Sequence, residues 1–234
     1  MYFIGSGSLL YQAINYCLMV GLPVDGACCS FEDTISEKLQ RKGVDVLKSL
    51  NPNKDRDLII EKSKDGIVFS INNKYFLKDE LLGSELRFYN IHNGLVQRYR
   101  GIAEVCIFVA ICRGEQEYGV TLQQILSGQE VDSGPVISQL CFPIKQDDVF
   151  SNVFEKSLML CQEIFELNVK AIYSESAHAK LIDVAPIIFT YKDVVDSGIS
   201  SDFSSLSRAI ELGHYKKFLP KLQAKIIEIQ RIRV

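Results

Sequence analysis

The chain has 234 residues, 47% of them hydrophobic, which is enough for one sizeable core or one core with a small appendage. The formal net charge is -3 with both signs mixed along the chain, so charge alone does not favour nucleic acid as a partner. The seven cysteines include no Cys-x-x-Cys pair, and most lie in apolar stretches. They indicate reduced, buried thiols, and we expect a cytoplasmic protein without a membrane span.

The first 91 residues alternate short apolar runs with amphipathic segments. Strands are predicted at 1–4, 24–30, 44–47, 66–71 and 87–91, and helices at 9–18, 35–43 and 57–62. This alternation is typical of an α/β fold, a Rossmann-like and mostly parallel sheet with helices on both faces. Ligands bind such sheets beyond the carboxyl ends of the strands, so the segments 5–8, 72–74 and 90–100 are candidate binding loops.

The second half continues with a predicted helix at 102–113, strands at 120–125 and 135–144, and a helix at 151–167. Beyond residue 173 the chain becomes polar around an apolar run at 184–189, and helices are predicted at 204–212 and 219–233. We therefore expect a catalytic domain at 1–175 and a small C-terminal extension at 176–234. The apolar spacing of the last helix predicts packing on the core, with a contact between two copies in a homodimer as the alternative.

Three polar side chains form the candidate site. Asn90 and His92 are two residues apart at the end of a predicted strand, so they face the same side of the sheet. Asp132 lies in a later loop that reads Asp132-Ser133-Gly134. An amide donor suits a developing oxyanion, while an imidazole or carboxylate can take a proton from an attacking amine. This set therefore predicts acyl transfer to an amine, although each residue alone is more often structural.

The ordered set Asn-x-His, Tyr99-Arg100-Gly101, Gly119-Val120-Thr121 and Asp-x-Gly resembles the formyltransferase family over roughly residues 1–145. That family includes methionyl-tRNA, glycinamide ribonucleotide and sugar N-formyltransferases. The resemblance implies 10-formyltetrahydrofolate as co-substrate and Asn90, His92 and Asp132 as catalytic residues. It also implies folate contacts along 70–76 and 128–132, namely Ser70, Ile71, Asn72, Tyr75, Phe76, Gly128 and Asp132.

Acceptor contacts are expected at Tyr99, Arg100 and Gly101 and at the first loop. The loop Gly5-Ser6-Gly7-Ser8 lacks the third glycine of a dinucleotide fingerprint, which would fall at Leu10. It leads into a helix N-terminus, which favours anions, and it resembles the first loop of glycinamide ribonucleotide formyltransferase. Ser6, Gly7 and Ser8 are therefore expected to hold an anionic part of the acceptor, with a simple turn as the alternative.

Glu104 either faces an acceptor ammonium or caps its helix, and the cap is the preferred interpretation. No metal-ligand spacing surrounds any histidine, so no metal is expected.

Two departures from the family bear on the acceptor. The sequence after the histidine is Asn93-Gly94-Leu95-Val96-Gln97, where the commoner family sequence is Pro-Ser-Leu-Leu-Pro. The stretch from Thr121 to Asp132 is about two residues longer than in common members of the family. We expect an N-formyltransferase that acts on a small or carrier-linked amine, either amino acid-derived, as on nonribosomal peptide assembly lines, or a nucleotide-linked amino sugar. The alternatives are a glycinamide ribonucleotide formyltransferase, a formyltetrahydrofolate hydrolase, and an inactive binding module. With no basic surface and too short a tail for the tRNA-binding barrel, tRNA is not expected.

Overall fold

The computed structural model describes residues 1–233 and separates into two compact units. Unit 1 comprises Met1–Ile91, Leu122–Ser138 and Gln162–Leu181. Unit 2 comprises His92–Thr121, Gln139–Cys161 and Ile182–Val234, of which the last residue is outside the described part. The predicted domain boundary near residue 175 stays a prediction.

Unit 1 is built on a seven-stranded sheet with the order β3-β2-β1-β4-β5-β7-β8. The pairs β3–β2, β2–β1, β1–β4 and β4–β5 are parallel, which confirms the predicted α/β fold with a mostly parallel sheet. The last residue of β5 and parts of β7 and β8 belong to unit 2. The strands are β1 Tyr2–Gly5, β2 Gly26–Ser30, β3 Val46–Ser49, β4 Ile67–Ile71, β5 Arg87–His92, β7 Glu117–Ile125 and β8 Val136–Pro143.

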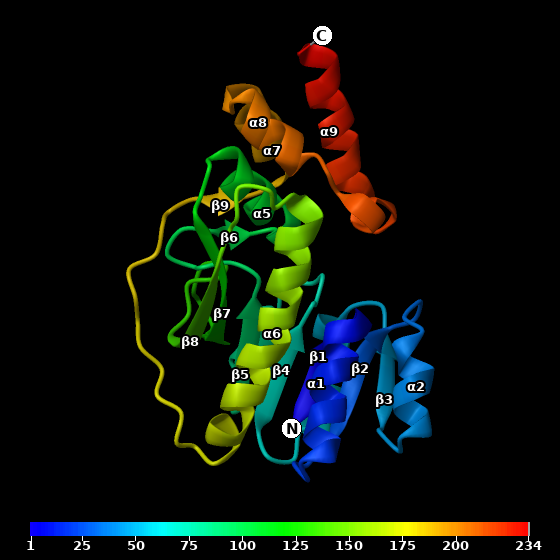
Figure 1. Ribbon diagram of the computed structural model, residues 1–234. Helices are drawn as coiled ribbons and strands as arrows, with labels where there is room; N and C mark the ends of the chain where they lie inside the picture. Colours follow the sequence, from blue (N-terminus) through cyan, green and yellow to red (C-terminus); the bar gives the residue numbers. More distant parts are fainter. Residues whose placement is uncertain (234) are drawn as a thin grey trace. The chain divides into compact units, whose positions relative to one another are not determined.

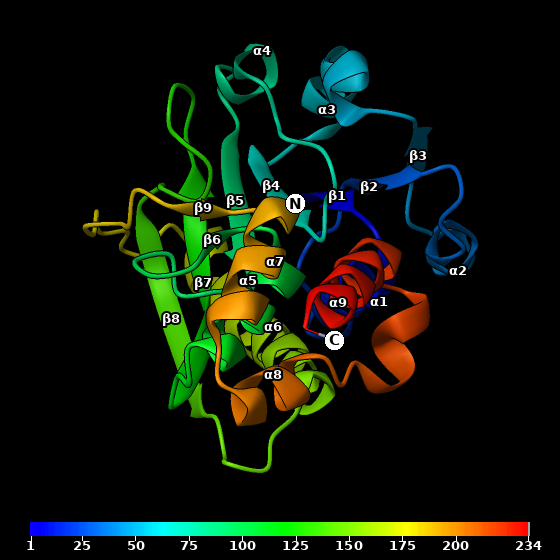
Figure 2. The same ribbon diagram turned by 90° about the horizontal axis from the view of Figure 1, so that it is seen from above.

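Helices cover both faces of this sheet. Figure 2 shows α1 and α2 on one face and α3 and α4 on the other. Tyr2 and Ile4 pack with Ile59 of α3 and Leu81 of α4, whereas the alternate residue Phe3 contacts Phe165 of α6 on the opposite face. Alternation along each strand therefore decides which helices a side chain meets. The helices are α1 Gly7–Met19, α2 Ile35–Arg41, α3 Arg56–Lys62, α4 Asp79–Leu82 and α6 Phe150–Tyr173, with a 3₁₀ turn η1 at Pro52–Asp55. Only the part of α6 from Gln162 onward belongs to unit 1.

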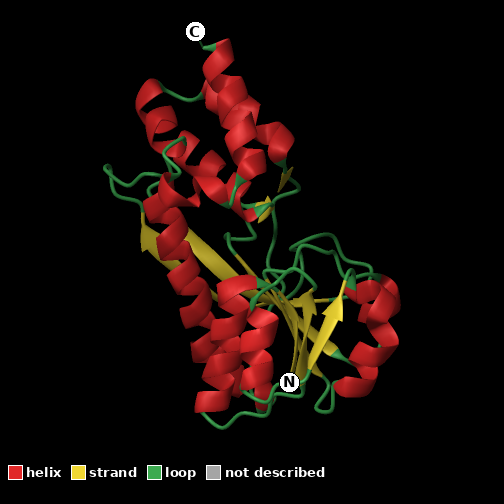
Figure 3. Ribbon diagram, turned by 90° about the vertical axis from the view of Figure 1, so that its right-hand side faces the viewer, coloured by secondary structure: helices red, strands yellow, loops and turns green. Residues whose placement is uncertain are grey.

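Unit 2 is organised around α5 (Ala103–Cys112), in which every residue from Val105 to Cys112 is buried. A helix that is apolar all round needs cover on every side, and α7 and α8 pack on it while α9 packs on α7. Figure 1 shows α7, α8 and α9 together, and Figure 3 shows that the C-terminal end is helical. The remaining elements are β6 Arg100–Gly101, β9 Ile188–Phe189, α7 Tyr191–Ser200, α8 Phe203–Ala209, η2 Gly213–Lys217 and α9 Pro220–Ile232.

The last helix confirms the predicted packing of its apolar positions. Leu222, Ile226 and Ile229 are buried in the core cluster of unit 2, while Ile232 is exposed. The sequence interpretation missed α7, although Thr190 and Asp193 form a complete capping box at its start. It also missed the two-residue strands β6 and β9, which pair in parallel far apart in the chain.

Six of the seven cysteines are buried and Cys141 is exposed. Burial raises the pKa of the Cys28 thiol and of the Cys29 thiol to about 12, because a thiolate loses its hydration there. No helix within residues 1–233 is both long enough and apolar enough to span a bilayer.

Candidate functional site

Asn90 lies near the carboxyl end of β5, where it pairs with Ser70 of β4. Phe88, two residues earlier on the same strand, belongs to the cluster that packs under α3 and α4. Because side chains alternate along a strand, Asn90 faces the same side of the sheet as Phe88. Asn90 is half-buried, so its carboxamide sits at the boundary between core and solvent. It belongs to unit 1, and His92, the last residue of β5, opens unit 2.

His92 is buried, with 5% of the residue exposed, and its Nε2 lies 2.7 Å from the carbonyl oxygen of Tyr99. A carbonyl oxygen only accepts, so Nε2 must carry a hydrogen, and in the neutral ring Nδ1 is then the basic nitrogen. Gly94 lies against this contact. A Cβ at Gly94 would be 2.6 Å from Nε2 and 2.7 Å from the Tyr99 oxygen, so only glycine leaves room for the bond.

Asp132 lies in unit 1, in the loop between β7 and β8. Its φ of +53° is in the left-handed region, which few residues other than glycine adopt. Its Oδ1 accepts a hydrogen bond of 3.2 Å from Nε2 of Gln123 on β7. A residue with a strained backbone keeps its conformation only when the surrounding structure holds it there. Asp132, the proposed catalytic carboxylate, is such a residue.

The same loop is fixed at both of its ends. At its start, Oδ1 of Asp79 accepts hydrogen bonds from Ser127 Oγ at 2.8 Å and Gly128 N at 3.0 Å. These bonds lower the pKa of Asp79, because they stabilise its charged form. At its end, a Cβ at Gly134 would stand 1.8 Å from the Gln124 oxygen, so the glycine lets the loop lie directly on β7.

The predicted acceptor residues of unit 2 take part in its internal packing. The Arg100 side chain is fully buried and donates to the Ala185 oxygen at 2.6 Å. Tyr99 stacks on Phe189, and its hydroxyl donates to Glu115 Oε1 at 2.7 Å. Glu104 accepts a hydrogen bond from the Tyr191 hydroxyl, which joins α5 to α7. These contacts give the residues structural roles, while their contact with an acceptor stays a prediction.

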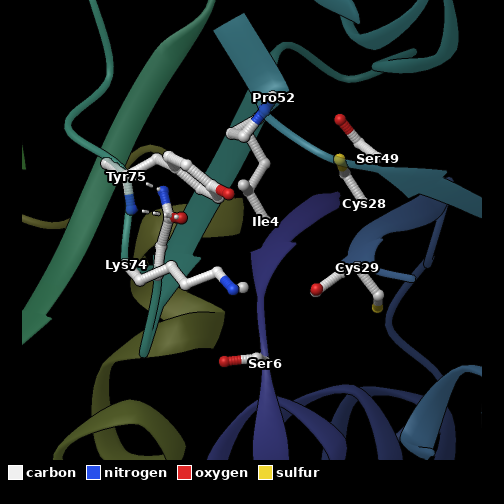
Figure 4. A pocket seen from close by; sticks show the side chains of 11 residues that line it. Ile4, Ser6, Cys28, Cys29, Ser49, Pro52, Lys74 and Tyr75 are labelled. Atoms are coloured by element: carbon white, nitrogen blue, oxygen red, sulfur yellow. Dashed lines mark hydrogen bonds between the residues drawn. The ribbon is translucent and has the colours of Figure 1, made fainter. Parts of the chain in front are cut away.

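The predicted first loop borders an open pocket in unit 1, at the carboxyl ends of β1, β2 and β4. In Figure 4 the Lys74 ammonium points into this pocket, and Ser6, Cys28 and Cys29 line its other side. The Gly7 N–H donates to Asp33 Oδ2 at 2.7 Å, and Ser6 Oγ donates to the Asn72 oxygen at 2.8 Å. An acceptor phosphate at this loop would therefore meet the Asp33 carboxylate.

The predicted folate segment after β4 is ordered by Asn73, a residue that the sequence interpretation missed as an individual contact. Its Oδ1 accepts from Tyr75 N at 3.1 Å and its Nδ2 donates to the Tyr75 oxygen at 2.9 Å. Asn72 has a φ of +49°, and Phe76 is 74% exposed. Ser70 and Ile71 are buried in the strand, so backbone and aromatic surface are what this segment offers a ligand. Among residues 1–233, no group of three His, Cys, Asp or Glu could hold a metal ion.

Comparison with known proteins identifies the segment that contains the proposed residues. The family model described as formyl transferase matches residues 60–167. Over this segment, just under half of the chain, the sequence is similar to the formyl transferase family. The matched segment includes Asn90, His92 and Asp132.

Curated relatives of this chain include methionyl-tRNA formyltransferases. That of Limosilactobacillus fermentum is 31% identical over 133 residues, which are 56% of this chain and 40% of the relative. That of Streptococcus uberis is 32% identical over 117 residues, which are 50% of this chain and 36% of the relative. The matched region thus spans about two fifths of the length of these proteins.

Solved structures share the fold over more of the chain. The N-formyltransferase from Helicobacter canadensis, in complex with folinic acid and dTDP-3-aminofucose, has a TM-score of 0.72 at 18% identity, covering 93% of this chain and 81% of that one. A sugar N-formyltransferase from a Shewanella species has a TM-score of 0.73 at 19% identity, covering 92% and 89%. Glycinamide ribonucleotide transformylase 1 from Symbiobacterium toebii has a TM-score of 0.65 at 21% identity, covering 78% and 93%.

Proposed function

We propose that this protein transfers the formyl group of 10-formyltetrahydrofolate to a primary amine. The observation that carries the proposal is the family match over residues 60–167, which contains Asn90, His92 and Asp132 in the expected order. In the reaction, the bond between the formyl carbon and N10 of the folate breaks and an amide bond to the acceptor forms. The amine loses one proton and N10 gains one.

The proposed roles follow from the chemistry of each side chain. Asn90 donates an N–H to the oxygen on which negative charge develops, and such a donor is typically worth about 3 kcal/mol. His92 accepts a proton through Nδ1, because its Nε2 hydrogen is committed to the Tyr99 oxygen at 2.7 Å. Asp132 supplies a carboxylate that stabilises the positive charge on the attacking amine.

The proposed folate contacts lie in two segments of unit 1. After β4, the backbone around Asn72 and the exposed ring of Phe76 offer hydrogen bonds and flat apolar surface. The second segment is the loop from Gly128 to Asp132, which Asp79 and Gln123 hold in place. Backbone donors with a flat apolar surface suit a planar ring system with polar edges.

We further propose a nucleotide-linked amino sugar as the acceptor. The folds of the two N-formyltransferases from Helicobacter canadensis and a Shewanella species cover 93% and 92% of this chain, whereas the fold of glycinamide ribonucleotide transformylase 1 covers 78%. A phosphate-bearing acceptor that approaches Ser6, Gly7 and Ser8 would be repelled by the Asp33 carboxylate. The Lys74 ammonium, which points into the same pocket, offsets this repulsion by attracting the phosphate. An amino acid-derived or carrier-bound amine and glycinamide ribonucleotide are the other acceptors to test.

A turnover assay tests the function. The protein is incubated with 10-formyltetrahydrofolate and one amine at a time, namely dTDP-3-aminofucose, glycinamide ribonucleotide or an aminoacyl phosphopantetheine, and release of tetrahydrofolate is followed. We expect release with the amino sugar. Asn90→Ala, His92→Ala and Asp132→Asn should each lower kcat at least about a hundredfold, because each removes a group that acts on the transition state.

The outcomes of this assay separate the competing functions. Release that needs no amine would identify a hydrolase, and folate binding without release would identify an inactive binding module. Either result overturns the proposal. Near-normal turnover in one of the three variants would remove that residue from the mechanism and leave the reaction standing. Thermal melting of each variant shows whether lost activity reflects lost folding.

A further inference from the structure

We infer that Gln123 is a positioning residue whose side-chain amide holds the carboxylate of Asp132 in its working orientation. The inference rests on the proposed function, in which Asp132 takes part in formyl transfer. Gln123 lies on β7 within unit 1, and its Nε2 donates to Asp132 Oδ1 at 3.2 Å. No expectation from the sequence assigned a role to this residue.

The side of the sheet that Gln123 faces follows from its neighbours. Ile125, two residues later on β7, packs against the cluster formed by Tyr2, Ile4 and Phe88 under α3 and α4. Side chains two apart on a strand share a face, so Gln123 lies on the same face as Asn90, and β7 is the strand next to β5. Gln123 therefore reaches Asp132 on the face of the sheet where Asn90 also stands.

Burying the Gln123 side-chain amide costs free energy, which argues against a role in packing alone. Gln123 is 2% exposed, and its Oε1 has no hydrogen-bond partner among the described residues. A buried polar atom without a partner costs about 1–3 kcal/mol, which an apolar side chain of similar size would avoid. An apolar side chain is compatible with this face of β7, because Ile125, two residues later, packs against the cluster under α3 and α4. The amide donor to Asp132 is the feature that an apolar residue could not supply.

The loop explains why Asp132 needs this contact. Its two ends are fixed, at Gly128 by Asp79 and at Gly134 by the close approach to β7. Asp132 stands between these anchors with its backbone in the left-handed region, at a φ of +53°. The bond from Gln123 couples the carboxylate of this strained residue to the rigid sheet. A side chain held by a strand is positioned more precisely than one held by a loop alone.

A neighbouring residue of the same type provides a matched control. Gln124 is adjacent on β7, so its side chain faces the opposite side, while its backbone N–H donates to the Pro135 oxygen at 2.9 Å. The test compares Gln123→Met with Gln124→Met, because methionine approximates the volume of glutamine without its amide. The acceptor is whichever amine of the panel above gives the highest turnover.

For Gln123→Met we expect kcat to fall about 10- to 100-fold with KM for the folate and the amine within threefold of wild type, and no loss of thermal stability. Gln124→Met should keep wild-type kcat. Gln123→His, which retains an N–H donor, should recover kcat to within about fivefold of wild type. The double variant Gln123→Met with Asp132→Asn should be no slower than Asp132→Asn alone, because one residue acts through the other.

A second measurement needs neither folate nor acceptor. In a ¹⁵N–¹H spectrum of the free protein, the side-chain NH₂ signal of Gln123 should move in Asp132→Asn, and the signal of Gln124 should not. Wild-type kcat in Gln123→Met, additive losses in the double variant, or an unmoved Gln123 signal would each overturn the inference. Absence of turnover in the wild type would overturn the proposed function instead. An active Asp132→Asn would remove Asp132 from the mechanism, and this inference with it, and leave the reaction standing.

Discussion

At the scale of single residues, the short segment from His92 to Tyr99 determines which nitrogen of the His92 ring carries the hydrogen and which one can accept a proton. The turn from His92 to Tyr99 brings the Tyr99 carbonyl to 2.7 Å from Nε2, and this bond decides which ring nitrogen is basic. Tyr118 donates to the Asn93 oxygen at 2.9 Å, and Thr121 Oγ1 donates to the Gly94 oxygen at 2.8 Å. These bonds hold the backbone on which the histidine depends.

The variant Gly94→Ala tests this arrangement. The added methyl would stand 2.6 Å from Nε2 and 2.7 Å from the Tyr99 oxygen, so the imidazole or the carbonyl must move. We expect kcat to fall at least about tenfold, because a small displacement of a proton-transfer group is enough to slow the reaction. Steady-state kinetics with thermal melting measures this. A fully active Gly94→Ala would show that the Tyr99 bond does not set the working position of His92.

At the scale of elements, the β7–β8 loop illustrates what a sequence reveals and what it leaves out. The strands that flank the loop follow from apolar runs, and Asp132 follows from the order of the family pattern. The anchors of the loop do not, because Asp79 lies on a four-residue helix 48 residues before Ser127. A partner at that separation has no local signature. Gln123 was missed for the same reason, since a glutamine in a strand suggests solvent when its partner is unknown.

The Asp79 anchor predicts a pH dependence for the loop. Hydrogen bonds from Ser127 and Gly128 lower the pKa of Asp79, so their contribution is complete above the ordinary pKa of 3.8 and is lost as pH falls through the folded value. Hydrogen exchange, corrected for intrinsic rates, should show the Gly128 amide less protected in Asp79→Ala than in wild type at pH 6. At strongly acidic pH the two proteins should converge.

The variant Glu80→Ala, in the same turn of α4, is the control and should exchange like wild type at pH 6. Equal protection of Gly128 in Asp79→Ala and wild type would show that the carboxylate does not hold the loop. Because the loop carries Asp132, Asp79→Ala should also lower turnover modestly, by about two- to tenfold.

At the scale of the whole molecule, the parallel sheet was predictable because its strands are apolar on both faces and separated by amphipathic helices. The helical packing of unit 2 was harder to predict. Its central helix α5 is apolar all round, so periodicity gives no indication of which elements cover it. The covering helices α7, α8 and α9 come some 80 or more residues later in the chain.

The distribution of buried and exposed thiols allows unfolding of this protein to be followed by thiol reactivity. Six cysteines are buried, in elements of both units, and only Cys141 is exposed. A colorimetric thiol reagent should react quickly with one group per native molecule and with seven after denaturation. The six slow groups would then report how often each unit opens, and Cys141→Ser should abolish the fast phase alone. A fluorophore placed at Cys141 would label β8 at a single site without any engineered cysteine.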